Sequence, residues 1–63
     1  MKVLLITGCK DKSMWYSDYV GRYVPFLEEE QIEYKSLEPA GYTNFVLRED
    51  CQVVETEKGV EFY

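Results

Sequence analysis

Turn residues divide this chain into short apolar segments, and their spacing constrains the fold more than any other feature. Within most segments apolar and polar residues alternate, as they do in half-buried strands. The pattern predicts five strands, at residues 2–8, 22–28, 31–37, 43–47 and 51–56. Short strands joined by tight turns that contain glycine or proline are typical of small antiparallel folds. The sequence therefore predicts an all-β domain, namely a small five-stranded antiparallel barrel.

Individual residues add detail to this prediction. Pro25 has no N–H to donate, so the second strand must lie at a sheet edge or contain a bulge there. Ile32 and Tyr34 alternate with charged residues and are expected to be the buried side of their strand. Val53 and Val54 make the fifth segment a core strand. That strand is expected to pair with the first, because such pairing removes open edges.

The stretch before the second strand allows two interpretations. Aromatic residues recur every four positions from Trp15 to Tyr23, which would suit a helix over residues 13–24 and a β-α-β unit. Gly21 and the many aromatic and β-branched residues oppose a helix. They favour an irregular aromatic loop over residues 14–20 that contains one helical turn.

The two ends of the chain each carry a suggestive motif. The opening "MKVLLITG" looks like the first strand of a nucleotide-binding fold, but the next glycine after Gly8 is Gly21, so no phosphate-binding loop follows. The opening run is also too short for a signal peptide or a membrane helix, so a cytoplasmic location without membrane association is expected. Near the other end, Lys58-Gly59 suits a tight hairpin that would return residues 60–63 as a further strand.

Charge is distributed unevenly along the 63 residues, which carry a net charge of −5. Residues 1–27 hold four basic and two acidic side chains, whereas residues 28–63 hold three basic and ten acidic ones. Because there is no basic stripe, the pattern argues against sequence-independent binding to a phosphate backbone. An acidic face would instead suit a basic protein surface. Alternatively, the acidic residues only keep a small protein soluble.

No residue pattern points to catalysis. The chain has no histidine, so a general base near neutral pH would have to be a perturbed carboxylate, a lysine or a thiolate. Neighbouring carboxylates such as Glu49 and Asp50 are expected in solvated turns. Cys9 and Cys51 are too few for a disulfide framework and have no adjacent base, so we expect two reduced, half-buried thiols close to each other. The sequence thus predicts no enzyme activity, no metal and no cofactor.

A family resemblance becomes visible in "WYSDYVGRYVPFLEEE" and "YKSLEPAGYTNFVLREDCQVVE". These segments resemble very small SH3-like barrel proteins encoded by bacteriophages and prophages, and the resemblance covers residues 15–55. It implies a five-stranded barrel with a single helical turn at residues 47–50, between the fourth and fifth strands. It also implies a phage accessory protein in the bacterial cytoplasm that binds and modulates a host protein, such as a defence protein, or a viral component. It carries no active site to transfer.

Exposed aromatic side chains are the candidate binding residues, because tyrosine and tryptophan dominate interface hot spots. Tyr16 and Tyr42 are expected to be exposed, whereas Trp15 and Phe45 could be either core or surface. The full candidate set comprises Trp15, Tyr16, Tyr19, Tyr42, Asn44 and Phe45, with an acidic rim of Glu28, Glu29, Glu30 and Glu33.

These residues predict a non-catalytic protein-binding module, monomeric or weakly self-associating, whose partner has a basic or apolar patch. The alternative is a nucleic-acid-associated barrel that stacks bases on its aromatic side chains. Stacking of that kind normally operates in a positively charged groove, which the charge balance of this chain opposes.

Overall fold

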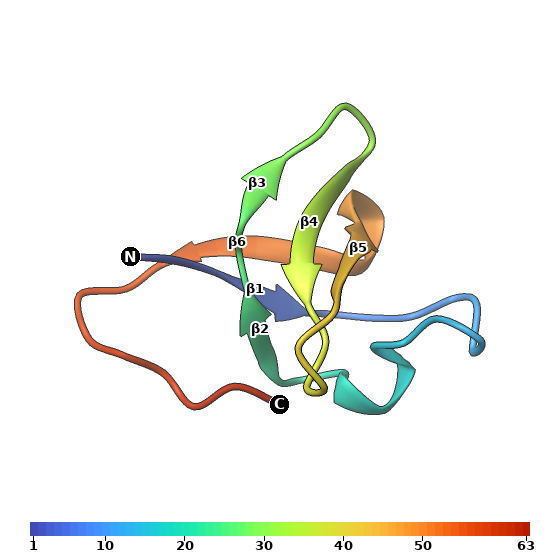
Figure 1. Cartoon of the computed structure of the whole chain (residues 1–63), viewed down its shortest axis with the longest axis horizontal. Helices are drawn as coiled ribbons and strands as arrows, with labels where there is room; N and C mark the ends of the chain where they lie inside the picture. The colour runs from blue at the N-terminus through green and yellow to red at the C-terminus, as the bar shows by residue number, and fades with distance from the viewer.

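The computed structural model describes all 63 residues, and it is built from strands joined by loops and two short 3-10 helices (Figure 1). The strands are β1 (Lys2–Ile6), β2 (Tyr23–Pro25), β3 (Glu28–Glu29), β4 (Glu33–Leu37), β5 (Thr43–Leu47) and β6 (Cys51–Glu55), and the helices are η1 (Ser17–Tyr19) and η2 (Arg48–Asp50). Neither helix has the length or the apolar composition to cross a membrane.

The strands form two three-stranded sheets, with the orders β2-β1-β6 (sheet A) and β3-β4-β5 (sheet B). All strand pairs within them are antiparallel. The all-β class is confirmed, but the two sheets are not closed into one continuous barrel. The first and last strands do pair, with Ile6 opposite Cys51, as predicted. The region over residues 13–24 contains one 3-10 turn and no α-helix, so the β-α-β alternative is wrong.

The strand predicted over residues 22–28 is divided between the two sheets. β2 ends at Pro25 and lies at the edge of sheet A, where the missing N–H removes no ladder hydrogen bond. Residues 26–27 then carry the chain into sheet B. The buried Ser36 hydroxyl of β4 donates to the Pro25 carbonyl at 2.6 Å and ties the two sheets together at this crossing.

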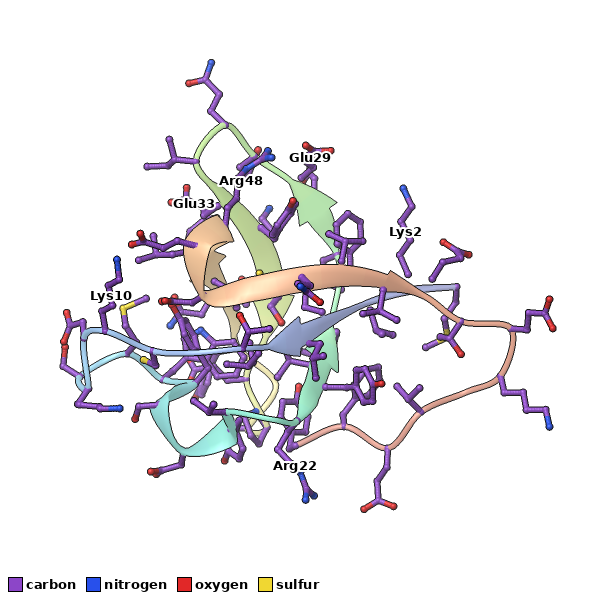
Figure 2. All side chains as sticks on the ribbon, turned by 180° about the vertical axis from the view of Figure 1, so that it is seen from behind. Lys2, Lys10, Arg22, Glu29, Glu33 and Arg48 are labelled. Carbon is purple, nitrogen blue, oxygen red and sulfur yellow. The ribbon has the colours of Figure 1, made fainter.

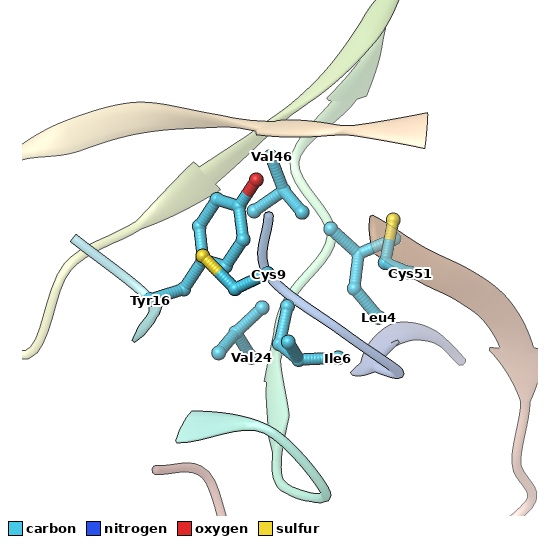
Figure 3. Packing of buried hydrophobic residues seen from close by; sticks show 7 residues of the cluster. All are labelled: Leu4, Ile6, Cys9, Tyr16, Val24, Val46 and Cys51. Carbon is cyan, nitrogen blue, oxygen red and sulfur yellow. The ribbon is translucent and has the colours of Figure 1, made fainter. Parts of the chain in front are cut away.

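The hydrophobic core lies between the two sheets and extends under the loop that joins β1 to β2 (Figure 3). Its buried members are Leu4, Ile6, Cys9, Tyr16, Val24, Val46 and Cys51. The two thiols are therefore buried rather than half-buried.

Two apolar residues expected in the core lie at the surface. Ile32 is 69% exposed because it sits in the turn that precedes β4, one residue before the strand begins. On that strand Ser36 is the buried residue. Val53 is 39% exposed, although its ladder partner Leu4 is fully buried. The reason is that β6 forms an edge of sheet A, so no neighbouring strand covers its outer side.

Side chains from the loop between β1 and β2 cover the free edge of β5. The Trp15 indole N–H donates to the Phe45 carbonyl at 2.9 Å, and the Leu47 N–H donates to the Tyr16 hydroxyl at 3.4 Å. The Phe45 N–H donates to the side-chain oxygen of Asn44 at 2.8 Å. These bonds occupy main-chain groups that would otherwise offer an open edge to another chain.

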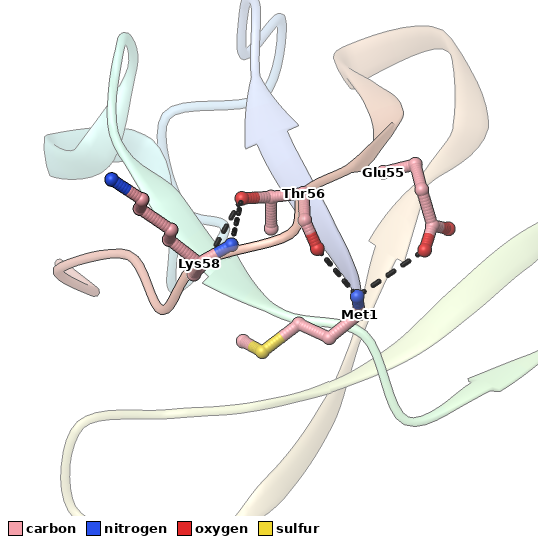
Figure 4. Close-up of polar contacts among 4 residues, drawn as sticks. All are labelled: Met1, Glu55, Thr56 and Lys58. Atoms are coloured by element: carbon pink, nitrogen blue, oxygen red, sulfur yellow. Dashed lines mark hydrogen bonds and ion pairs between the residues drawn. The ribbon is translucent and has the colours of Figure 1, made fainter.

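The predicted hairpin at Lys58 is wrong. The Thr56 hydroxyl donates to the Lys58 carbonyl and accepts from the Lys58 N–H in a local turn, while the terminal ammonium of Met1 donates to the Thr56 carbonyl and the Glu55 carboxylate (Figure 4). The chain then crosses to β2 instead of returning beside β6. There Phe62 makes one isolated parallel bridge, so residues 60–63 form no strand.

Tyr63 anchors this tail, and we expect Tyr63→Ala to lower the free energy of unfolding by about 2 kcal/mol. Its ring packs edge-on against the Tyr19 ring, with the two centroids 5.7 Å apart. Its hydroxyl donates to the Leu37 carbonyl, and its main-chain N–H donates to the Tyr23 carbonyl at 2.8 Å. Urea titration measures the loss, with exposed Glu61→Ala as the matched control in the same tail. Equal stability of the two variants would show that the tail is not anchored by Tyr63.

Candidate functional site

The outward side of sheet B gathers apolar side chains at the surface. Residues opposite each other in a ladder share a face, so Phe45 lies with Lys35, and Leu47 lies with Glu33. Their neighbour Val46 is fully buried on the other side of β5, which makes the Phe45 side the outward one. We call Leu37, Phe45 and Leu47, together with Tyr42 in the turn at their end, the β5 face.

Tyr42 is the most exposed member of the β5 face, and it lies in a turn closed by hydrogen bonds. Its side chain is 71% exposed, which confirms the expected exposure, and Phe45 is 40% exposed. The Glu38 N–H donates to the Tyr42 carbonyl at 2.8 Å, and Gly41 adopts a φ of 100° that few other residues tolerate. The Asn44 amide donates to the Glu38 carboxylate at 2.9 Å, so Asn44 stabilises this turn.

Trp15 and Tyr19 belong to a row of aromatic rings that packs mainly within the molecule. The ring centroids of Trp15 and Tyr19 are 6.5 Å apart, and Tyr19 in turn contacts Tyr63. Both side chains are half-buried. Trp15 borders the β5 face through its hydrogen bond to Phe45, whereas Tyr19 packs against the tail.

Tyr16 was expected at the surface, and this prediction is wrong. Its side chain is fully buried, because the loop between β1 and β2 folds across the space between the sheets and Tyr16 fills it. Its hydroxyl donates to the buried Asp50 carboxylate at 2.5 Å. Burial, reinforced by this hydrogen bond to Asp50, raises the pKa of Tyr16. Tyr16 is therefore not available as a surface anchor.

The acidic residues are divided between the two sides of the β3–β4 hairpin (Figure 2). Glu28 shares the outward side with Lys35, to which it is paired at 3.4 Å, and Glu33 lies on the same side. Glu29 lies on the opposite side and is paired with Arg48 at 2.8 Å.

Arg48 also donates to the main-chain carbonyl of Glu30, in the turn of the hairpin. Of the residues in the two ladders, Glu28 and Glu33 lie on the side of the β5 face and Glu29 does not. Tyr42 lies at the other end of β4 from Glu33, about 13 Å away along the strand. The expected acidic rim does not surround the aromatic residues.

The two thiols lie in an environment that disfavours their ionised form. No disulfide joins Cys9 and Cys51. Burial, with a smaller contribution from the Asp50 carboxylate, raises the pKa of Cys51 to about 11 and also raises the pKa of Cys9. Both groups therefore hold little thiolate near neutral pH.

We expect both thiols of the native protein to react slowly with a disulfide reagent at pH 8 and rapidly after unfolding in urea. The reason is that burial both raises the thiol pKa and blocks access. Absorbance of the released thiolate follows the reaction, and the urea-unfolded chain is the control. Prompt modification of Cys9 or Cys51 in the native protein would contradict this assignment.

The structure contains no pocket, and no three His, Cys, Asp or Glu side chains are grouped as a metal site would require. Searches with family models, against curated proteins and against solved structures found no match to this chain. Function is therefore inferred from the surface of the chain itself. Its main feature is the β5 face, which the sequence indicated through Tyr42 and Phe45 but not through Leu37 and Leu47.

Proposed function

We propose that this chain is a non-catalytic protein-binding module whose partner docks on the β5 face. The observation that carries the proposal is the exposure of Tyr42 and Phe45, one in the turn that leads into β5 and the other on the outward side of that strand. These two aromatic side chains lie three positions apart in the chain, and aromatic side chains supply the rigid contact area that dominates binding hot spots. The hydrogen-bonded turn at Tyr42 supports the same function, because a preorganised anchor loses little entropy on binding.

The partner we propose is a host or viral protein with an apolar patch for the aromatic residues and basic side chains beside it. The net charge of −5, the exposed Glu28 and the half-buried Glu33 favour a basic border. We further propose that the chain is a phage accessory protein acting in the bacterial cytoplasm, with the five-stranded SH3-like barrel as its finer fold. The pairing of β1 with β6, and the position of η2 between β5 and β6, support this barrel.

Capture of partners from bacterial lysate by three immobilised forms of the protein tests this function. Wild type and the control Val20→Ser, which alters a residue of similar exposure in another loop, are expected to retain the same protein. The double variant Tyr42→Ser, Phe45→Thr is expected to lose it. Equal capture by all three forms would contradict the proposal. So would salt-sensitive, micromolar binding of single-stranded DNA that depends on the same two aromatic residues.

A further inference from the structure

One sheet edge of this molecule is long and uncovered. The edge of β5 is covered by Trp15 and Tyr16, the tail bridges to β2 through Phe62, and β3 is only two residues long. The remaining edge belongs to β6, which spans five residues and has β1 as its single neighbour.

The ladder register shows which main-chain groups point out from β6. Met1 and Thr56 exchange two hydrogen bonds, of 2.9 Å and 2.5 Å, and are therefore a hydrogen-bonded pair. Because such pairs alternate along an antiparallel ladder, Gln52 and Val54 direct their N–H and C=O groups toward β1. Val53 and Glu55 direct their main-chain N–H and C=O groups away from β1, where these groups have no hydrogen-bond partner.

Beyond this edge lie two aromatic rings on the inner side of sheet B, Phe26 just before β3 and Tyr34 on β4, which we call the aromatic shelf. The rings of Phe26 and Tyr34 lie 5.7 Å apart and are both half-buried. The Arg48 guanidinium covers Tyr34 at 4.7 Å, and the Lys2 ammonium lies 5.9 Å from the Phe26 ring. Figure 2 shows Lys2 and Arg48 on the same side of β6, one toward each end of the strand. Sheet A therefore ends at β6, whereas the β3–β4 hairpin of sheet B projects past β6 (Figure 1).

We propose that an extended segment of a partner protein adds to β6 as a fourth strand of sheet A, alternating apolar and basic side chains. Its main chain would bond to the outward groups of Val53 and Glu55, and its apolar side chains would contact Val53 and the shelf. The net charge of −5 favours basic side chains between the apolar ones. The carboxylates of Glu29 and Glu55 remain largely exposed, although each is already paired, with Arg48 and with the Met1 ammonium respectively. This surface is separate from the β5 face and does not depend on it.

A second copy of the chain does not fit this edge. Two-fold pairing centred on Val53 would place both sheets B on the same side of the joined sheets A. Each β3–β4 hairpin extends past its own β6, so the two hairpins would collide (Figures 1 and 2). The shared negative charge opposes the same pairing. A single extended segment avoids both conflicts.

Titration of the isotope-labelled protein with a blocked peptide of alternating lysine and valine tests the proposal by NMR. We expect slower amide exchange at Val53 and Glu55, and little change at Gln52 and Val54, whose amides already bond to β1. A peptide of the same sequence with N-methylated valines lacks half of its main-chain donors and is expected to bind at least about tenfold more weakly. Equal binding of the two peptides would overturn the proposal.

The variant Val53→Pro removes one outward N–H without removing a ladder bond, and Val53→Thr is its control. Peptide binding is expected to be lost in the first and kept in the second. If Val53→Pro does not fold, the N-methylated peptide decides the question on the wild-type chain. Concentration-dependent sedimentation without peptide that Val53→Lys abolishes would instead assign the edge to a second copy. Phe45→Thr is expected to bind the peptide as wild type does, so this experiment tests the β6 edge independently of the β5 face.

Discussion

Replacing Tyr16 by alanine is expected to unfold the domain at room temperature. The side chain is fully buried in the core, and truncation of such an aromatic residue costs about 3–5 kcal/mol. A chain of this length has a total stability of roughly 3–9 kcal/mol. The lost ring, together with about 1–3 kcal/mol for a buried acceptor left unpaired, removes most of it. The change also leaves the buried Asp50 carboxylate without its hydroxyl donor. Far-UV circular dichroism and urea titration measure the outcome.

Tyr16→Phe isolates the contribution of the hydroxyl, because it keeps the ring. We expect it to lower the free energy of unfolding by about 2–3 kcal/mol, since Asp50 remains buried with a hydrogen bond missing. Tyr42→Phe is the matched control, and it should change stability by no more than about 0.5 kcal/mol because its hydroxyl is exposed. A Tyr16→Ala variant that melts like wild type would show that Tyr16 lies at the surface.

Tyr42→Ala is expected to weaken partner binding by roughly thirtyfold, which corresponds to about 2 kcal/mol, while the melting temperature stays near that of wild type. The side chain is exposed on a hydrogen-bonded turn, so truncation removes contact area with the partner without opening the core. Phe45→Thr is expected to act in the same direction and keeps a residue suited to a strand. Isothermal titration with the captured partner gives both affinities.

Val20→Ala is the control for these two variants, because Val20 is exposed but lies away from the β5 face. Its affinity for the partner is expected to equal that of wild type. Loss of folding in Tyr42→Ala, with unchanged affinity in the folded fraction, would assign this tyrosine to the core and remove the basis of the proposed site.

Most strand positions could be predicted from sequence because local signals determine them, although the division of residues 22–28 between two sheets could not. β5 has the predicted bounds, and Pro25 lies on an edge strand as its missing N–H requires. The helical turn before Cys51 also lies where it was expected. Alternation and turn residues act over a few positions, so a single sequence contains the information.

The burial of Tyr16 could not be predicted in this way, because it depends on contacts between distant residues. Tyr16 and Tyr42 both lie beside polar turn residues, and their local patterns are alike. Only Tyr16 meets a buried partner, Asp50, which lies 34 positions further along the chain. The division of Glu28 and Glu29 has a simpler origin, since adjacent residues of a strand lie on opposite faces. It was missed because the predicted strand ended at residue 28 and left Glu29 outside it.

The most direct test of the protein-binding function is an NMR titration of the isotope-labelled chain with the captured partner. We expect the largest amide shifts at Tyr42 and along β5, from Thr43 to Leu47, with small shifts at Val20 and in the tail. Shifts concentrated in the tail or the loop after β1, with β5 unchanged, would contradict this expectation.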